Sequence, residues 1–548
     1  MINSAFPVKF VGIFIVFLYI SLAASHAQTS YYFYVQFSDK NHSPYSLSNP
    51  AEFLSARAIA RRSSFGVTCD STDLPVNPSY LKQLSNLGVS VHNVSKWMNG
   101  ATVLVPDSGI MGRVRALSFV RFVEYTGRLE GAALAPKKVA AVSTAFDYGI
   151  AGNQINQLNG ANLHNEGYRG KGIQIAVIDA GFTNVNINSC FDSLRLQNRL
   201  LGTKDIINPT SDIYTEDAHG AMVLATMAGN LPGQFLGTAP DASYWLIRTE
   251  YSPTEYKVET DFWTSGIEFA DSVGVDLVNS SLGYFTFDDP GMNFTYQDMN
   301  GKVSRASRAA GLTVKKGMVV VVSAGNEGNQ GWHYIGSPAD AEGIVTVGAV
   351  TSTGVSSTFS SFGPSSDGRV KPEVCAMGTS SAIVSTAGEA GYGSGTSFAS
   401  PILAGMMACL LQRYKALDSN NDIDILINSV FKSGNLYAAP TTQQGYGIPD
   451  FAKAEQNLIT FDSFLKANKS DFVLTYNSLT KKINIRYVGE GNMSKASVRI
   501  YSIIGNLVAT QTITDVSTYI SVDRFRIGIY AVCISENEKM VTRKILIN

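Results

Sequence analysis

The spacing of apolar residues in the first part of the chain predicts short strands that alternate with short helices. Aromatic and β-branched residues predict strands at Tyr31 to Ser38, Val89 to Val94, Ala101 to Val105 and Val120 to Tyr125. One helix is expected to begin at Asn49 with Pro50 in its first position, one to carry Leu81, Leu84 and Leu87 on a single face, and one to cover Ser108 to Leu117. Residues 28–128 therefore predict a small α+β domain.

The central region, residues 129–459, predicts a parallel sheet that is covered by helices. Four nearly continuous Val/Ile/Met-rich runs are typical of strands buried on both faces: Ile173 to Ile178, Val275 to Val278, Met318 to Val322 and Ile344 to Val350. Apolar stripes predict one helix around Val258 to Ala270 and a second from Ile402 to Leu411. The predicted fold class is α/β.

Beyond residue 466 the pattern changes to alternating, β-rich stretches. Lys482 to Val488, Ser497 to Ser502 and Gly528 to Ile534 are separated by Gly and Asn turns. Residues 466–548 therefore predict an all-β sandwich. The polar, weakly periodic segment Asp462 to Ser470 is predicted to link it to the central domain.

Residues 1–27 have the pattern of an export signal. Lys9 precedes an apolar run from Phe10 to Leu22, and Ser25 and Ala27 place small residues before a cut at Gln28. The run is shorter than the ~20 residues that a membrane-spanning helix needs, so a cleaved signal peptide is favoured over an anchor. We expect the protein to be exported.

Composition and charge narrow the functional classes. The 43 Lys+Arg against 44 Asp+Glu give a net charge of -1, so no overall field attracts nucleic acid. This balance conceals segment charges of +4 for residues 28–128, -11 for 129–459 and +5 for 460–548. The 5 Cys are far apart and form no Cys-x-x-Cys pair, which favours buried small residues over a disulfide scaffold or a zinc site.

A candidate nucleophile stands at the start of the second central helix. Gly395-Thr396-Ser397 precedes Phe398-Ala399-Ser400-Pro401, and Pro401 is expected in the first helical turn. Ser397 would then lie at a helix N-terminus, where the dipole and free N–H groups favour developing negative charge. On its own, such a Gly-Thr-Ser sequence is more often an ordinary helix cap.

A serine nucleophile needs a base, and few histidines qualify. No His follows Ser397, which excludes the Ser, Asp, His order of the α/β-hydrolases. His219 opens an apolar helix, and Asp179 ends a buried strand, where a carboxylate can hold an imidazole in one tautomer. Asp179, His219 and Ser397 are therefore a candidate triad.

With these residues in view, the central region resembles the catalytic domain of the subtilisin-like serine peptidases, the subtilases. Leu163 to Gly170 resembles the lead-in to the family's first core strand, Gly237 to Pro240 its turn after the histidine helix, and Gly445-Tyr446-Gly447 its closing motif. The resemblance covers about residues 160–455. It implies that Asp179, His219 and Ser397 are the catalytic residues of a serine peptidase.

The resemblance also implies which groups surround the reacting carbonyl. Asn326, in Ser323 to Gly328, matches the family's oxyanion donor, with the Ser397 backbone N–H as its companion. The substrate pocket would be walled by Ser281-Leu282-Gly283 and by Ser323-Ala324-Gly325, with its floor near Gly336. Because these residues are small or apolar, a large apolar side chain is expected before the scissile bond.

The chain departs from the family pattern at two positions. Ala180 follows the Asp where Ser or Thr is usual, and Ala221 follows the His-Gly pair where Thr is usual. The lost hydroxyls are expected to affect the rate or the pH optimum more than the mechanism. The loop between Met227 and Leu236 lacks the ligands of a tight calcium site, so neither a metal nor another cofactor is predicted.

The two outer regions also resemble known domains. Residues 28–128 resemble, in layout and position, the subtilase propeptide, which assists folding and inhibits the enzyme until cleaved. Its +4 charge is consistent with docking on the -11 central domain. Ile500 to Val508, Phe525 to Val532 and Thr542 to Ile547 follow the pattern of the C-terminal sorting domain of type IX secretion substrates, with a generic β-sandwich binding module as the alternative.

Together these observations predict an exported serine endopeptidase that is made as a precursor. Its expected partners are protein or peptide substrates, its own propeptide as inhibitor, and the secretion machinery; nucleic acid is not among them. Two other functions stay open: a catalytically inactive subtilase that serves as a surface binding module, and an esterase or amidase with the same triad.

Overall fold

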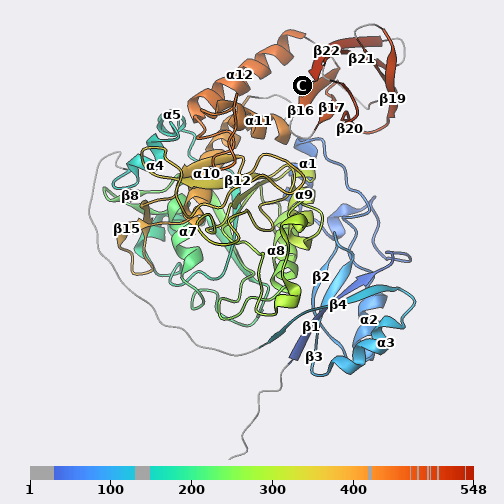
Figure 1. Ribbon diagram of the computed structural model, residues 1–548, viewed down its shortest axis with the longest axis vertical. Helices are drawn as coiled ribbons and strands as arrows, with labels where there is room; N and C mark the ends of the chain where they lie inside the picture. The colour runs from blue at the N-terminus through green and yellow to red at the C-terminus, as the bar shows by residue number, and fades with distance from the viewer. Residues whose placement is uncertain are drawn as a thin grey trace, which may run out of the picture.

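The computed structural model describes residues 30–129, 148–417, 422–468, 471–477, 481–489, 493, 495–502, 505–526, 528–536 and 539–547. An N-terminal α+β domain, a large α/β domain and a C-terminal β-rich tail follow one another along the chain (Figure 1). The predicted signal peptide, residues 1–27, lies outside the described residues. Among those described, no helix combines the length and the apolar character that crossing a membrane requires.

The N-terminal domain is a four-stranded antiparallel sheet whose two faces have different partners. The strand order is β2-β3-β1-β4, with β1 at Ser30–Phe37, β2 at Ser90–Ser95, β3 at Gly100–Val105 and β4 at Val120–Leu129. Phe33 and Val35 pack against α2 (Pro78–Asn86) and α3 (Met111–Arg115), which follows the 3-10 turn Ser108–Ile110. Tyr32 and Tyr34 point the other way, into the core of the central domain.

One helix of this domain begins later than the sequence predicts. Asn49 precedes only a single 3-10 turn, Pro50–Glu52, because its side-chain amide donates to Glu52 and does not accept a helix N–H. Helix α1 (Ala56–Ser64) begins instead after Ser55, whose hydroxyl accepts from the Ala58 N–H. The prediction of a helix that begins at Asn49 was therefore wrong, since Ser55 is the effective cap.

The central domain is built on a seven-stranded parallel sheet, which confirms the predicted fold class. The strand order is β13-β12-β11-β10-β5-β9-β6. Their bounds are β5 Gln174–Asp179, β6 Leu200–Asp205, β9 Ser243–Arg248, β10 Leu277–Ser280, β11 Val319–Ser323, β12 Val345–Val350 and β13 Val374–Met377. Successive side chains of β11 enter two different cores, Val319 and Val321 on one face and Val320 and Val322 on the other.

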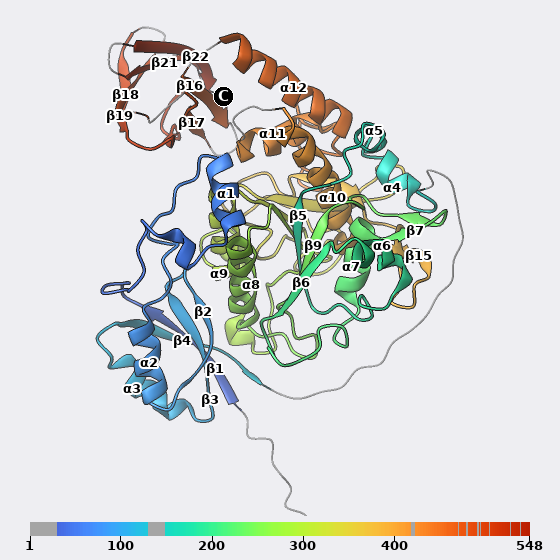
Figure 2. The same cartoon turned by 180° about the vertical axis from the view of Figure 1, so that it is seen from behind.

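Helices cover both faces of this sheet, as Figures 1 and 2 show from opposite sides. Helices α7 (His219–Ala228) and α10 (Thr396–Lys415) pack on one face, and α8 (Glu259–Val273) and α9 (Arg305–Lys315) pack on the other. The smaller elements are α4 Gly152–Asn156, α5 Ala161–Asn165, α6 Asp192–Leu196, α11 Ile423–Ser433, 3-10 turns Ser189–Phe191, Pro290–Met292 and Tyr296–Asp298, and hairpins β7 Asn230–Leu231 with β8 Phe235–Leu236 and β14 Ser381–Val384 with β15 Ala390–Gly393.

The C-terminal tail consists of two antiparallel sheets that enclose a core of their own. One sheet contains β16 (Phe472–Asn477), β17 (Lys482–Tyr487) and β20 (Ser517–Ser521); the other contains β18 (Ala496–Ser502), β19 (Leu507–Ile513), β21 (Gly528–Glu536) and β22 (Lys539–Ile547). Ile483 and Ile485 of the first sheet meet Val498 and Val532 of the second.

The predicted linker at Asp462 to Ser470 is mostly helical. Helix α12 extends from Phe451 to Asn468, so most of the predicted linker is the second half of this helix. Its first half is tied to the central core by Phe451, Ala454 and Leu458, and no Gly or Pro interrupts the chain that continues from it. Residues 469–470 lie outside the described residues.

The N-terminal domain docks on α8 through buried ion pairs. Asp271 accepts from Arg61 at 2.6 Å and from Arg62 at 2.8 Å, and its Oδ2 lies 3.1 Å from Lys96 Nζ. Its carboxylate is fully buried, and the three cations hold its pKa far below the usual range against the opposing effect of burial. Glu268, one turn earlier, accepts from Ser95 Oγ at 2.6 Å.

Candidate active site

The carboxyl ends of three neighbouring strands meet at one edge of the central sheet. In β10, Ser280 pairs with Ile178 of β5 and with Val322 of β11. The next residues along these strands are Asp179, Ser281 and Ser323, so the register places them in a row. In parallel α/β sheets, this edge is where ligands bind.

Asp179 is buried and bonds the ring of His219. His219 begins α7, and its backbone N–H donates to Asp217 Oδ1 at 2.7 Å. The ring Nδ1 lies 2.7 Å from Asp179 Oδ1, which also accepts from the Ala180 N–H at 2.8 Å. A carboxylate at this distance favours a proton on Nδ1 and leaves Nε2 able to accept one.

The second oxygen of Asp179 is unsatisfied. Asp179 Oδ2 has no hydrogen-bond partner among the residues that the structure describes. A buried acceptor without a donor costs free energy. The unsatisfied oxygen is consistent with the loss of hydroxyl donors that Ala180 and Ala221 lead us to expect.

The charges around His219 favour its protonated form. Burial lowers the pKa of His219, but the carboxylate of Asp179 opposes this by its charge and its hydrogen bond. Asp217 and Glu250 add further negative charge, and the net effect is a raised pKa. Since only a neutral imidazole can take a proton, this arrangement moves the base-competent range toward higher pH.

We predict that Asp217→Asn shifts the acid limb of the pH profile of kcat/KM to lower pH. The substitution removes a charge that raises the pKa of His219, so the imidazole is neutral at a lower pH than in the wild type. The amide oxygen of Asn can still accept from the His219 N–H, which preserves the start of α7. Rates of peptide hydrolysis between pH 5 and 9 test this, and an acid limb that moves to higher pH would contradict it.

Ser397 is held at the start of α10 by a hydrogen bond that the helix itself cannot make. The helix begins at Thr396, so Pro401 lies in its second turn and not in the first, as the sequence suggested. Proline has no N–H, and the carbonyl four residues before Pro401 is that of Ser397. This free carbonyl accepts from Ser281 Oγ at 2.9 Å, which ties α10 to the end of β10.

The hydroxyl of Ser397 is partly exposed and weakly bonded. Its Oγ lies 3.5 Å from the Ser281 carbonyl oxygen, and it forms no hydrogen bond with His219. The ring of Phe398, the residue after Ser397, has its centroid 6.3 Å from that of His219. The starts of α7 and α10 therefore lie at the same edge of the sheet. Catalytic hydrogen bonds in unliganded enzymes are often long and shorten only when substrate binds.

Asn326 faces the same helix start in a fixed orientation. Its Oδ1 accepts from the Thr396 backbone N–H at 2.9 Å and from Thr396 Oγ1 at 3.1 Å. These two donors require the amide oxygen of Asn326 on their side, which assigns the other amide atom as Nδ2. Nδ2 is a donor without an acceptor among the described residues. An amide N–H beside a candidate nucleophile is suited to bind an oxyanion.

The predicted pocket walls lie next to each other. Tyr284, which follows Ser281-Leu282-Gly283, forms a two-way backbone bridge with Ser337 at 2.7 and 3.0 Å. A Cβ on Gly336 would lie 3.2 Å from the Tyr284 carbonyl oxygen, so a side chain there requires the opposite wall to shift by a few tenths of an ångström. Ser323 and Ala324 are buried, and Gly325, at φ +107°, has Ser361 Oγ 2.8 Å from the position of a Cβ.

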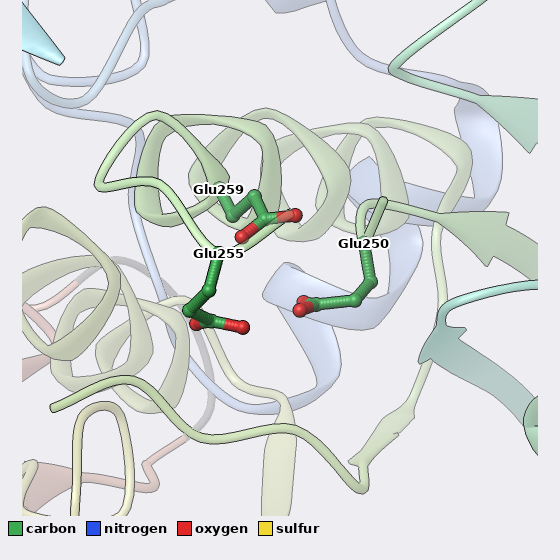
Figure 3. Close-up of side chains that lie close together, drawn as sticks. All are labelled: Glu250, Glu255 and Glu259. Atoms are coloured by element: carbon green, nitrogen blue, oxygen red, sulfur yellow. The ribbon is translucent and has the colours of Figure 1, made fainter. Parts of the chain in front are cut away.

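Three glutamates close to this edge were missed by the sequence analysis. Glu250 follows β9, Glu255 lies in the next loop and Glu259 begins α8, and their carboxylates face one another in Figure 3. One carboxylate oxygen of each lies within 4.8 Å of the others, which is close enough to hold a metal ion. The irregular spacing along a loop gave no periodic signal.

The proximity of these carboxyl groups changes their acidity. Burial raises the pKa of Glu250 to about 7, with the charge of Asp179 adding to the rise and hydrogen bonds with Tyr284 and Glu255 opposing it. Burial and the neighbouring Glu250 raise the pKa of Glu255 to about 9. Glu250 also accepts from the Tyr284 hydroxyl at 3.1 Å, and Glu259 accepts from the Tyr251 N–H at 2.9 Å. Some of these groups therefore stay protonated at neutral pH, where Glu250 contributes part of a charge near His219.

The parallel sheet, together with an edge where Asp, His and Ser meet, defines a subtilisin-like serine peptidase. Comparison with family profiles agrees: the Subtilase family profile matches residues 170–447. The chain belongs to the subtilase family. The profile described as Peptidase S8 propeptide domain, Bacteroidota, matches residues 32–141, and that of the Secretion system C-terminal sorting domain matches residues 477–548.

Curated relatives and a solved structure extend this result. The chain is 30% identical over 286 residues to Subtilisin E of Bacillus subtilis (strain 168), which covers 52% of this chain and 67% of the relative. It is 26% identical over 317 residues to the serine protease AprX of the same strain, over 51% and 67%. The crystal structure of the epidermin leader peptide processing serine protease from Staphylococcus aureus covers 78% of this chain and 98% of its own, with a TM-score of 0.51 at 16% identity, and supports the fold.

Proposed function

We propose that this chain is the precursor of an exported serine endopeptidase with Asp179, His219 and Ser397 as its triad. His219 Nε2 takes the proton of Ser397 Oγ, which attacks the peptide carbonyl carbon. When the C–N bond breaks, His219 returns the proton to the leaving amine. Water then hydrolyses the acyl-enzyme by the same route, and the mechanism uses no metal or other cofactor.

One observation carries this proposal: the 2.7 Å hydrogen bond between His219 Nδ1 and the buried Asp179, at the edge where α10 presents Ser397. Asp179 holds the ring in the tautomer that a base requires and stabilises the imidazolium that forms. The Nδ2 group of Asn326 and the Ser397 N–H would bind the oxyanion of the tetrahedral intermediate.

A fluorophosphonate probe tests the proposal, because it reacts only with an activated serine. We expect the mature protein to be labelled at Ser397 and to hydrolyse casein. If the probe does not label the protein, the chain would instead be the inactive binding module. A labelled protein that turns over small esters but not casein would be an esterase or amidase, and both results would contradict the proposed endopeptidase.

We further propose that the two outer domains control when and where the peptidase acts. The N-terminal domain would inhibit the enzyme until cleaved, supported by its match to a propeptide and by its buried contacts with α8. The tail would direct the chain to the cell surface through the secretion machinery, supported by its match to a sorting domain. The exact ends of the domains, predicted at residues 28–128, 129–459 and 466–548, belong to this proposal.

We predict a preference for Phe, Tyr, Leu or Met before the scissile bond. Burying such a side chain against the small and apolar walls gains roughly 1.5–3 kcal/mol. The two carboxylates that follow Gly336 in the sequence are already engaged: Asp340 is buried against Ser307, and Glu342 pairs with Lys482 of the tail. Profiling with a peptide library tests the preference, and a profile dominated by Lys and Arg would contradict it.

Gly336→Asp should shift the profile toward basic residues, while Gly336→Asn, of similar size, should not.

A further inference from the structure

The tail contacts both other domains at one junction. Helix α1 of the N-terminal domain lies directly beside the sheet of β16, β17 and β20, and both views show this (Figures 1 and 2). Among the contacts between the tail and the central domain, Lys482 pairs with Glu342 at 3.0 Å, and Asn484 Nδ2 donates to Asp422 Oδ2 at 2.7 Å.

Arg486 of β17 occupies the centre of this junction. Its side chain is almost fully buried, and Nη2 donates to the Ser64 carbonyl oxygen at 3.3 Å. It also lies against Gly66, where a Cβ would be 3.2 Å from the guanidinium Nε. Ser64 is the last residue of α1, so a cation from the tail meets the negative end of a helix dipole of the N-terminal domain.

The remaining environment of Arg486 compensates its charge only in part. Nε and Nη1 have no hydrogen-bond partner among the described residues. Burial lowers the pKa of Arg486, and the charge of Asp422 opposes this. The Asp422 carboxylate, however, accepts from Asn484 and from the Asp424 N–H and not from Arg486. The carbonyl end of α1 is thus the hydrogen-bonding partner of this buried cation.

We propose that the C-terminal tail is a clamp that holds the N-terminal domain on the central domain. Departure of the N-terminal domain removes the Ser64 carbonyl and the packing of Gly66 on Arg486, so the docked tail loses contacts that favour it. Linkage makes the effect reciprocal, so a docked tail opposes release of the N-terminal domain to the same extent. The inference goes beyond the proposed peptidase activity, since it concerns how the three parts of the precursor hold one another.

Hydrogen exchange of the full chain carrying Ser397→Ala tests the clamp without any dependence on catalysis. We expect Arg486→Ala to raise amide exchange in α1 about tenfold, equivalent to about 1.4 kcal/mol. Arg499→Ala is the matched control, because Arg499 is an exposed arginine of the same tail, and it should leave α1 unchanged. Equal exchange of α1 in the two variants would overturn the proposal.

A second variant covers the case in which Arg486→Ala unfolds the tail. Loss of exchange protection in β18 and β21 would reveal such unfolding, and Arg486→Lys would then decide. Lysine keeps the charge but has a shorter, single-point donor group, so we expect a smaller rise in the exchange of α1 with β18 and β21 still protected. Suppose that Arg486→Ala unfolds the tail while Arg486→Lys keeps it folded. If α1 then exchanges in Arg486→Lys at the wild-type rate, the proposal is overturned.

Discussion

Replacing Ser397 by alanine is expected to lower kcat by about 10⁶-fold, the loss that removal of the corresponding serine causes in subtilisin. The reason is chemical, since without Oγ no acyl-enzyme can form and His219 has no proton to take. If the enzyme removes its own N-terminal domain, the variant should also keep that domain attached. Hydrolysis of a fluorogenic peptide and the mass of the secreted chain measure both effects.

Ser394→Ala is a suitable control for this experiment. Ser394 is an exposed serine in the same segment, and its Oγ only accepts from the Ser380 N–H at 3.0 Å. It should therefore retain activity and processing. Appreciable hydrolysis by the Ser397 variant would contradict the triad.

The second large effect is expected at the interface between the N-terminal domain and α8. Asp271→Ala should weaken inhibition of the mature enzyme by the separate N-terminal domain by about 10²–10⁴-fold, because breaking a buried ion pair costs about 3–5 kcal/mol. Arg61, Arg62 and Lys96 would all lose their shared partner in the bound state. Inhibition constants against a peptide substrate provide the measurement.

Asp192→Ala provides the comparison with a surface ion pair. Asp192 pairs with Arg195 of the same helix, α6, in a solvent-exposed position, so its loss should leave the inhibition constant nearly unchanged. High salt should slow association with the N-terminal domain but leave most of the affinity, since the pairs at Asp271 are shielded from ions. An inhibition constant unchanged by Asp271→Ala would show that the ion pairs are not what holds the domain.

The sequence allowed the sheet and the candidate site to be predicted because both have local signals. The Val/Ile-rich runs are buried on both faces. Asp179 stands at the end of a strand, and Ser397 stands at the start of a helix. The structure brings Asp179, His219, Asn326 and Ser397 to one edge; their catalytic roles stay predictions until the variants are measured.

Features that depend on distant contacts could not be predicted in the same way. Arg61 and Asp271 are 210 positions apart, and segment charges of opposite sign gave only the direction of the attraction. Glu250 and Glu255 lie in the loop before α8 and Glu259 begins that helix, so no periodicity shows that these side chains converge. The start of α1 depended on whether Asn49 or Ser55 supplies the cap, and only the local hydrogen bonds decide this.

The proline in α10 has a consequence for how this site can change. One backbone hydrogen bond is missing from α10, and Ser281, which follows β10 and lies 116 positions earlier, donates to the free Ser397 carbonyl instead. A substitution at Pro401 that restores an N–H would let the helix close on itself and compete with Ser281 for the same carbonyl. The position of Ser397 therefore depends on Ser281 and Pro401 together. A substitution at one of them, or a transfer of this helix start to another protein, has to keep the other as well.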